Sequence, residues 1–144
     1  MSRSVHLDAN VILRFLRNDD AQQSPITAEF FKRAQLGELH PIVSSVTVLE
    51  VFYVLSKVYR LAPVDTARIV HTFLASGLAL CEDGGVTLDA LRRITANKIS
   101  FGDAYLAATA TSAKEEIASF DKGVAAFKDV RIYPLDSLKS APKK

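Results

Sequence analysis

The chain alternates short apolar runs with longer segments of helical period, and this alternation restricts its fold more than any other feature. Each apolar run suits a short strand, and the segments between them repeat apolar residues at three- and four-residue spacing. The predicted strands cover residues 4–7, 41–44, 78–80, 117–120 and 131–133. The predicted helices cover residues 9–17, 25–36, 46–60, 63–76, 85–97, 102–113 and, for a short one, 122–127.

Strands that alternate with helices predict βαβ units and therefore an α/β fold. We expect a three-layer α/β/α arrangement around a mostly parallel sheet of about five strands. The 144 residues, 49% of them hydrophobic, suit a single domain. We expect this domain over residues 1–138, followed by a short basic tail at residues 139–144. For the helix at 25–36, Ser24 is the expected N-cap and Pro25 the first helical residue.

Composition excludes several classes of protein. The formal net charge of +2 is too small to predict nucleic-acid binding by itself. The single cysteine, Cys81, excludes an internal disulfide, fits a reducing compartment and is expected to be a small buried residue. No apolar run approaches the roughly 18–20 residues that a membrane span needs. The sequence therefore indicates a soluble, cytoplasmic protein without a membrane partner.

Four acidic residues occur at comparable places in this pattern. Asp8 directly follows the first predicted strand, and Asp121 directly follows the fourth. Glu50 lies early in the helix that leaves the second strand, and Asp103 lies in the first turn of the helix beginning near residue 102. In open parallel sheets, ligands bind beyond the carboxyl ends of the strands. We therefore expect these four side chains at one edge of the sheet.

Each acid also has a purely structural interpretation, because acids are favoured at helix N-termini. Asp8 and Asp121 could be N-caps, and Ser100 with Asp103 has the spacing of a capping box. Glu50 fits this interpretation less well, since it is the only charge in "VTVLEVFYVL". A lone acid in such a helix is usually paired, exposed to solvent or functional.

Taken together, the four acids favour a metal site over four separate caps. Two carboxylates about 4 Å apart repel by roughly 4 kcal/mol at an effective dielectric constant near 20. A divalent cation would relieve this repulsion, and Mg²⁺ and Mn²⁺ prefer carboxylate and water oxygens. Such an ion can activate water and hold phosphate oxygens, the usual means of phosphodiester cleavage. No His or Cys pair has zinc-ligand spacing, and there is no P-loop or nucleophile elbow.

Four segments in order give the chain a family resemblance: "LDANVILRFL", "VSSVTVLEVFYVL", "ISFGDAYLAATA" and "SFDKGVAAF". The chain resembles the PIN-domain ribonucleases over residues 5–134, and within them the VapC-type toxins of prokaryotic toxin–antitoxin pairs. The resemblance implies a Mg²⁺- or Mn²⁺-dependent endoribonuclease that cleaves RNA with metal-activated water. It further implies a homodimer and a cognate antitoxin that blocks the site.

The family's acidic quartet falls on four residues of this chain by resemblance: Asp8, Glu50, Asp103 and Asp121. Asp8 and Asp103 would be the most direct metal ligands, and Glu50 and Asp121 would act through bound water. Three polar residues would orient these carboxylates: Asn10, Ser119 and, more weakly, Ser45, which could instead cap its helix. The segment after Asp121 lacks the further acid that some members carry, so the number of metal ions stays open.

Two other functions remain as alternatives. The first is a non-catalytic PIN-like module that binds RNA or protein, which metal binding without RNA cleavage would favour. The second is a phosphatase of the haloacid-dehalogenase type, since "LDAN" resembles its strand-end aspartate motif. Against the phosphatase, Asn10 stands where its second aspartate should be, and Ala107 stands where a later one is needed.

Overall fold

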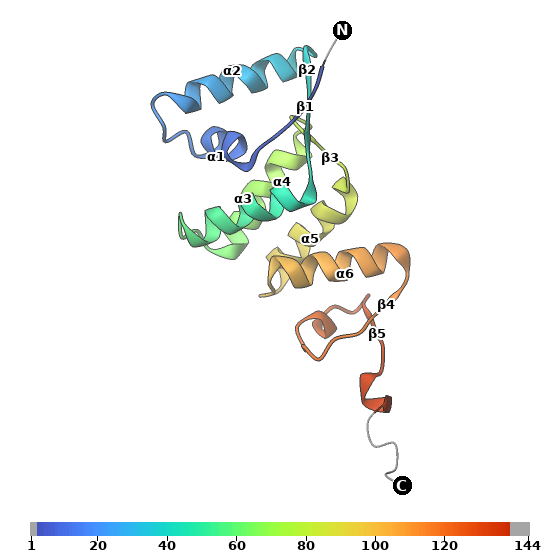
Figure 1. Ribbon diagram of the computed structural model, residues 1–144. Helices are drawn as coiled ribbons and strands as arrows, with labels where there is room; N and C mark the ends of the chain where they lie inside the picture. Colours follow the sequence, from blue (N-terminus) through green and yellow to red (C-terminus); the bar gives the residue numbers. More distant parts are fainter. Residues whose placement is uncertain (1–2, 139–144) are drawn as a thin grey trace.

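Five short strands and six helices follow one another in the computed structural model, which describes residues 3–138 (Figure 1). The strands are β1 (Arg3–His6), β2 (Leu39–Val43), β3 (Leu80–Cys81), β4 (Glu116–Ile117) and β5 (Arg131–Ile132). The helices are α1 (Ala9–Arg17), α2 (Gln23–Gln35), α3 (Ser45–Lys57), α4 (Pro63–Ala75), α5 (Gly84–Ala96) and α6 (Phe101–Ala113). Two 3₁₀ turns, η1 (Val124–Ala126) and η2 (Leu135–Leu138), lie near the C-terminal end.

The strands form two parallel sheets. In the first sheet β2 lies between β1 and β3, with Arg3 opposite Leu39 and Ile42 opposite Leu80. In the second sheet β4 pairs only with β5, with Ile117 opposite Ile132. All of these pairings are parallel because a helix or a helical turn returns the chain between successive strands.

The predicted α/β class with parallel strands is therefore confirmed, and all five predicted strands appear near their expected positions. They do not form one sheet of about five strands. The physical reason is that β4 packs with β5 against α6, while the outer edge of β1 carries no neighbouring strand among residues 3–138. The predicted basic tail at 139–144 lies outside the described residues.

The main hydrophobic core lies among β1, β2, β3 and the helices α1 to α5, and it also takes in one face of α6. Its largest fully buried side chains include Phe31, Leu55 and Leu91. Phe31 packs against Phe15 at a centroid distance of 4.5 Å with the rings tilted by 46°, and it meets Phe73 edge-on at 5.6 Å. These aromatic contacts join α1, α2 and α4, so the N-terminal part of the chain is tied together by side chains far apart in sequence.

A second, smaller hydrophobic cluster lies on the opposite side of α6. It consists of Ala107, Ala110, Ile117, Val124 and Phe127. Helix α6 thus buries Phe101, Ala104 and Ala108 in the main core, and Ala107 and Ala110 in the second cluster. Its small side chains allow close packing on both faces, which explains the alanine-rich sequence "AYLAATATSA".

Helix ends match the sequence in part. Cys81 is buried and has no disulfide, as predicted. The prediction for the start of the second helix was wrong, because α2 already begins at Gln23. The backbone N–H groups of Gln22 and Gln23 donate to Asp20 Oδ1 at 3.0 and 2.7 Å, whereas the Ser24 hydroxyl donates to the carbonyl of Arg14. Asp20, which lies two residues before the N-cap Gln22, therefore accepts hydrogen bonds from the backbone at the start of α2, and Ser24 does not.

Candidate functional site

Asp8 follows β1 and occupies the N-cap position of α1 with extended backbone angles. Its carboxylate accepts no capping hydrogen bond, and its side chain is exposed. Its exposed carboxylate borders a groove between α1 and α2 that has a volume of about 440 Å³. The interpretation of Asp8 as an ordinary capping residue therefore lacks the hydrogen bond that would define it.

Glu50 lies in the second turn of α3 and is exposed. Among residues 3–138 no hydrogen bond or ion pair engages its carboxylate. Its neighbours Val48, Val51 and Phe52 are buried, so α3 turns its apolar face to the core and leaves Glu50 outside. Of the three interpretations of this acid, the paired one is excluded for the part of the chain that the structure describes.

Asp103 and Asp121 come from different elements and converge on one point. A Cβ atom built on Gly123 would lie 3.4 Å from Asp121 Oδ1 and 3.9 Å from Asp103 Oδ2. No Lys, Arg or His side chain within residues 3–138 forms an ion pair with either carboxylate. Two carboxylates without a basic partner on one side of a glycine suit a hard divalent cation, which prefers oxygen ligands.

Both acids of this pair are held by local hydrogen bonds. The Ser100 hydroxyl accepts from the backbone N–H of Asp103 at 3.1 Å and caps α6. Asp121 Oδ1 accepts from the backbone N–H of Gly123 at 2.9 Å, a turn that aspartate commonly stabilises. One of the two hydrogen bonds of the expected capping box is thus present, the one from the Asp103 N–H to the Ser100 hydroxyl. The Asp103 side chain is directed to the loop after β4.

Of the four acids, the structure brings only Asp103 and Asp121 together. Among residues 3–138 there is no group of three or more His, Cys, Asp or Glu side chains that could hold a metal ion. Asp103 and Asp121 lie beside the second sheet, while Asp8 and Glu50 belong to elements of the first. The carboxyl ends of β1 and β4 belong to separate sheets, and the prediction that all four acids form one site stays a prediction.

The three expected supporting residues have different surroundings. The Ser119 hydroxyl accepts from the backbone N–H of Asp121 at 2.9 Å and so shapes the turn that holds this acid. Asn10 is exposed on α1 and lines the same groove as Asp8. Ser45 does not cap α3. The N-cap residue is Ser44, whose hydroxyl accepts from the backbone N–H of Thr47 at 3.2 Å.

Sequence reasoning missed a polar contact that joins three helices near the ends of β2 and β3. The Tyr105 hydroxyl of α6 donates a short hydrogen bond to Asp83, which precedes α5, and lies 3.5 Å from the Ser45 hydroxyl of α3. The hydrogen bond to Asp83 raises the pKa of the Tyr105 phenol above its usual range. The "DGG" segment was interpreted only as a turn, and nothing in the sequence connects it to a tyrosine 22 residues later.

The chain belongs to the PIN domain family, whose model matches residues 5–132. A search among curated proteins finds no match. PIN domains are generally nucleases that use Mg²⁺ or Mn²⁺, so the family supports a hydrolase that acts on nucleic acid and weighs against the phosphatase alternative. No helix within residues 3–138 is long and apolar enough to cross a membrane.

Proposed function

We propose that this PIN-domain protein is a Mg²⁺- or Mn²⁺-dependent endoribonuclease and the toxin of a type II toxin–antitoxin pair. The observation that carries the proposal is the convergence of Asp103 and Asp121 on Gly123 without a basic partner among residues 3–138. Asp8 and Glu50 complete the proposed ligand set. Both are exposed and neither carboxylate is engaged by a hydrogen bond or ion pair in the described part of the chain, so both are accessible to an ion.

The carboxylates suit the proposed cation chemically, because oxygen donors without nitrogen or sulfur favour Mg²⁺ and Mn²⁺ over zinc. A bound ion would supply water activation and charge neutralisation at a phosphodiester. The chain's own contribution is orientation. Hydrogen bonds with Ser119 and Gly123 fix the turn around Asp121. The Ser100 hydroxyl accepts from the backbone N–H of Asp103 and fixes the first turn of α6.

The proposed partners are RNA, a cognate antitoxin protein and a second copy of the chain. Exposed apolar side chains on α3 are compatible with a protein partner: Val46, Leu49 and Tyr53 are 74%, 43% and 59% exposed. Their spacing of three and four residues puts them on one side of the helix. We propose a cytoplasmic location, in keeping with a single buried cysteine that forms no disulfide.

The second candidate function is a non-catalytic PIN module that binds RNA or protein. The observation that favours it is that no group of three or more potential metal ligands occurs within residues 3–138. Metal-dependent RNA cleavage separates the two functions, because only the nuclease requires the carboxylates to act on a substrate.

The test is RNA cleavage with Mg²⁺ or Mn²⁺ by wild type, Asp103→Asn and Asp65→Asn. Asp65 is the matched control, because it is also an acid in the first turn of a helix, α4, but lies on the surface beside Arg68. We expect wild type and Asp65→Asn to cleave, and Asp103→Asn to lose more than about 100-fold, beyond what loss of an outer-sphere partner costs. Activity that persists in EDTA, or an equal loss in both variants, would refute the metal site.

A further inference from the structure

The groove between α1 and α2 is lined by Asp8, an acid of the proposed metal site, and by Arg14, which has no role in that site. Its volume of about 440 Å³ falls within the range of small-ligand sites. It is lined by Asp8, Asn10, Val11, Arg14, Gln23, Ile26 and Thr27. Asn10 and Arg14 are four residues apart on α1, and Gln23, Ile26 and Thr27 have the same one-sided spacing on α2. Two helix faces therefore form the walls, with Asp8 at the N-terminal end of α1.

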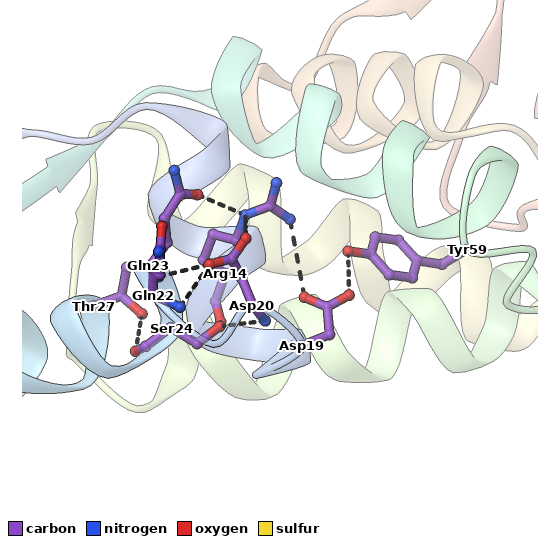
Figure 2. A network of polar contacts seen from close by, with 8 residues as sticks. All are labelled: Arg14, Asp19, Asp20, Gln22, Gln23, Ser24, Thr27 and Tyr59. Atoms are coloured by element: carbon purple, nitrogen blue, oxygen red, sulfur yellow. Dashed lines mark hydrogen bonds and ion pairs between the residues drawn. The ribbon is translucent and has the colours of Figure 1, made fainter.

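The guanidinium of Arg14 is held at this groove by a hydrogen bond to Gln23 of α2 (Figure 2). Its Nε donates to Gln23 Oε1 at 2.9 Å. The Ser24 hydroxyl donates to the carbonyl of Arg14 at 2.8 Å and joins α2 to α1 at the same level. The Arg14 side chain is 32% exposed, so it is held in position yet open to a ligand.

Arg14 forms only long ion pairs with the two nearby acids. Asp19 and Asp20 lie 3.9 and 4.0 Å from the guanidinium, at the outer limit of an ion pair. Asp19 accepts from the Tyr59 hydroxyl at 2.8 Å, and Asp20 accepts from the backbone N–H groups at the start of α2 (Figure 2). These backbone hydrogen bonds lower the pKa of Asp20 below its usual range. Both acids thus have better donors, and a guanidinium has five N–H groups, more than these contacts use.

We infer that the α1–α2 groove binds a nucleotide of single-stranded RNA next to the cleaved bond, with Arg14 holding its phosphate. This inference rests on the proposed function and adds the position of the substrate. A guanidinium suits a phosphate because it can donate two parallel hydrogen bonds. Val11 and Ile26 offer apolar surface to a base or sugar, and the amides of Asn10 and Gln23 offer hydrogen bonds to base edges or the 2′-hydroxyl.

The direct test is the salt dependence of binding of a short single-stranded RNA, measured by fluorescence anisotropy with Ca²⁺ in place of Mg²⁺. For single strands, each phosphate contact contributes about 0.7 to the slope of log affinity against log salt. We expect Arg14→Gln to reduce this slope by about 0.7 and to weaken binding roughly tenfold. Arg14→Lys should restore most of the slope, since the charge returns without the planar fork.

Two control variants, Arg33→Gln and Leu36→Lys, guard against a general loss of fold or a general effect of charge, and a third variant, Ile26→Lys, tests the groove. Arg33→Gln removes a cation from the same helix as Gln23, but Arg33 pairs with Glu29 outside the groove and should leave the slope unchanged. Ile26→Lys adds a cation at a groove position that is 68% exposed, and should steepen the slope by about 0.7. Leu36→Lys, at a site 66% exposed beyond the end of α2, should not.

The results separate this inference from the proposed function. Suppose that wild type cleaves RNA and that Arg14→Gln and Ile26→Lys have the same slope of log affinity against log salt as wild type. This result would overturn the groove inference and leave the proposed nuclease function intact. Wild type that binds RNA with the expected slopes but cleaves none with Mg²⁺ or Mn²⁺ would overturn the nuclease alone. Undetectable RNA binding by wild type would overturn the groove inference, because the groove would then hold no RNA.

Discussion

The part of the chain from β1 to α5 and the part from α6 to β5 are held together in different ways. In the first part, β1 and β2 pair along four residues, and aromatic rings from three helices meet in a shared core. In the second part, β4 and β5 pair along two residues, and the separate cluster contains five buried side chains, two of them alanines. Because stability follows buried apolar surface, the second part should open more easily than the first.

This difference matters for the proposed function because the four candidate acids are divided between the two parts. Asp8 and Glu50 belong to the extensively packed part, whereas Asp103 and Asp121 belong to the other. Helix α6 connects them, since it contributes buried residues to both clusters. The proposed site therefore depends on how α6 and the loop after β4 are held against the first sheet.

The largest effect we expect is a contrast between two phenylalanine truncations. Phe31→Ala should lower the free energy of unfolding by about 4 kcal/mol, because Phe31 is 2% exposed in the main core. Phe127→Ala should cost about 3 kcal/mol, confined to opening of the second cluster. Hydrogen exchange measures this directly: Phe127→Ala should raise exchange at residues 116–133 only. Faster exchange throughout the chain in both variants would show that the two parts unfold together.

The next prediction asks whether the divided acids act together. Asp8→Asn and Glu50→Gln should each reduce RNA cleavage by more than about 100-fold, as expected for Asp103→Asn, although Asp8 and Glu50 lie in the other part of the chain. Neither variant should lower the thermal midpoint without metal, because Asp8 makes no capping hydrogen bond and Glu50 is exposed. Mg²⁺ should raise the midpoint of wild type more than that of either variant. Full activity in Asp8→Asn would leave only the Asp103–Asp121 pair as a site.

A smaller effect is expected at the contact that fastens the second part to α5. Arg93 is 7% exposed, donates two hydrogen bonds to Asp129 at 2.9 and 2.6 Å, and lies over the Phe127 ring at 4.8 Å. Arg93→Met should cost about 2 kcal/mol, since it removes the cation and these contacts but keeps much of the side chain's volume. Chemical denaturation measures the loss, and Arg92→Met, at an exposed neighbour, serves as the control. Equal stability of the two variants would contradict the role of Arg93.

The smallest effect concerns pH. The Arg93 guanidinium holds the pKa of Asp129 below its usual range, so folding is favoured by the ionised carboxylate. This stabilisation should be complete above the ordinary aspartate pKa and should disappear as pH falls through the lower pKa of the folded state. Wild type should therefore lose stability more steeply than Asp129→Asn as the pH falls below about 4. Because the Asp129 side chain is 53% exposed, the difference should stay below about 1 kcal/mol. If the stability of wild type and of Asp129→Asn changed with pH in parallel, the contribution of the Asp129 carboxylate would be excluded.

Local sequence determined the elements of this protein and most of their limits. Apolar periodicity predicts every helix from α1 to α6 to within about three residues, since a helix depends on neighbours three and four positions away. The start of α2 shows the limit of such reasoning. Ser24 has the right type and spacing for a cap, but its hydroxyl is engaged by a carbonyl of α1, which no local pattern reveals.

Tertiary structure alone decided which strands pair and which side chains meet. The sequence places an acid after β1 and another after β4, but strand pairing is a long-range choice, and here β4 pairs with β5. Asp103 and Asp121 therefore converge on Gly123 while Asp8 faces a groove with Arg14. The same applies to Tyr105 and Asp83, and to Arg93 and Asp129, which lie 36 residues apart. Contacts of this kind arise when helices pack in three dimensions, so residue type and spacing predict the candidates and only packing selects the partners.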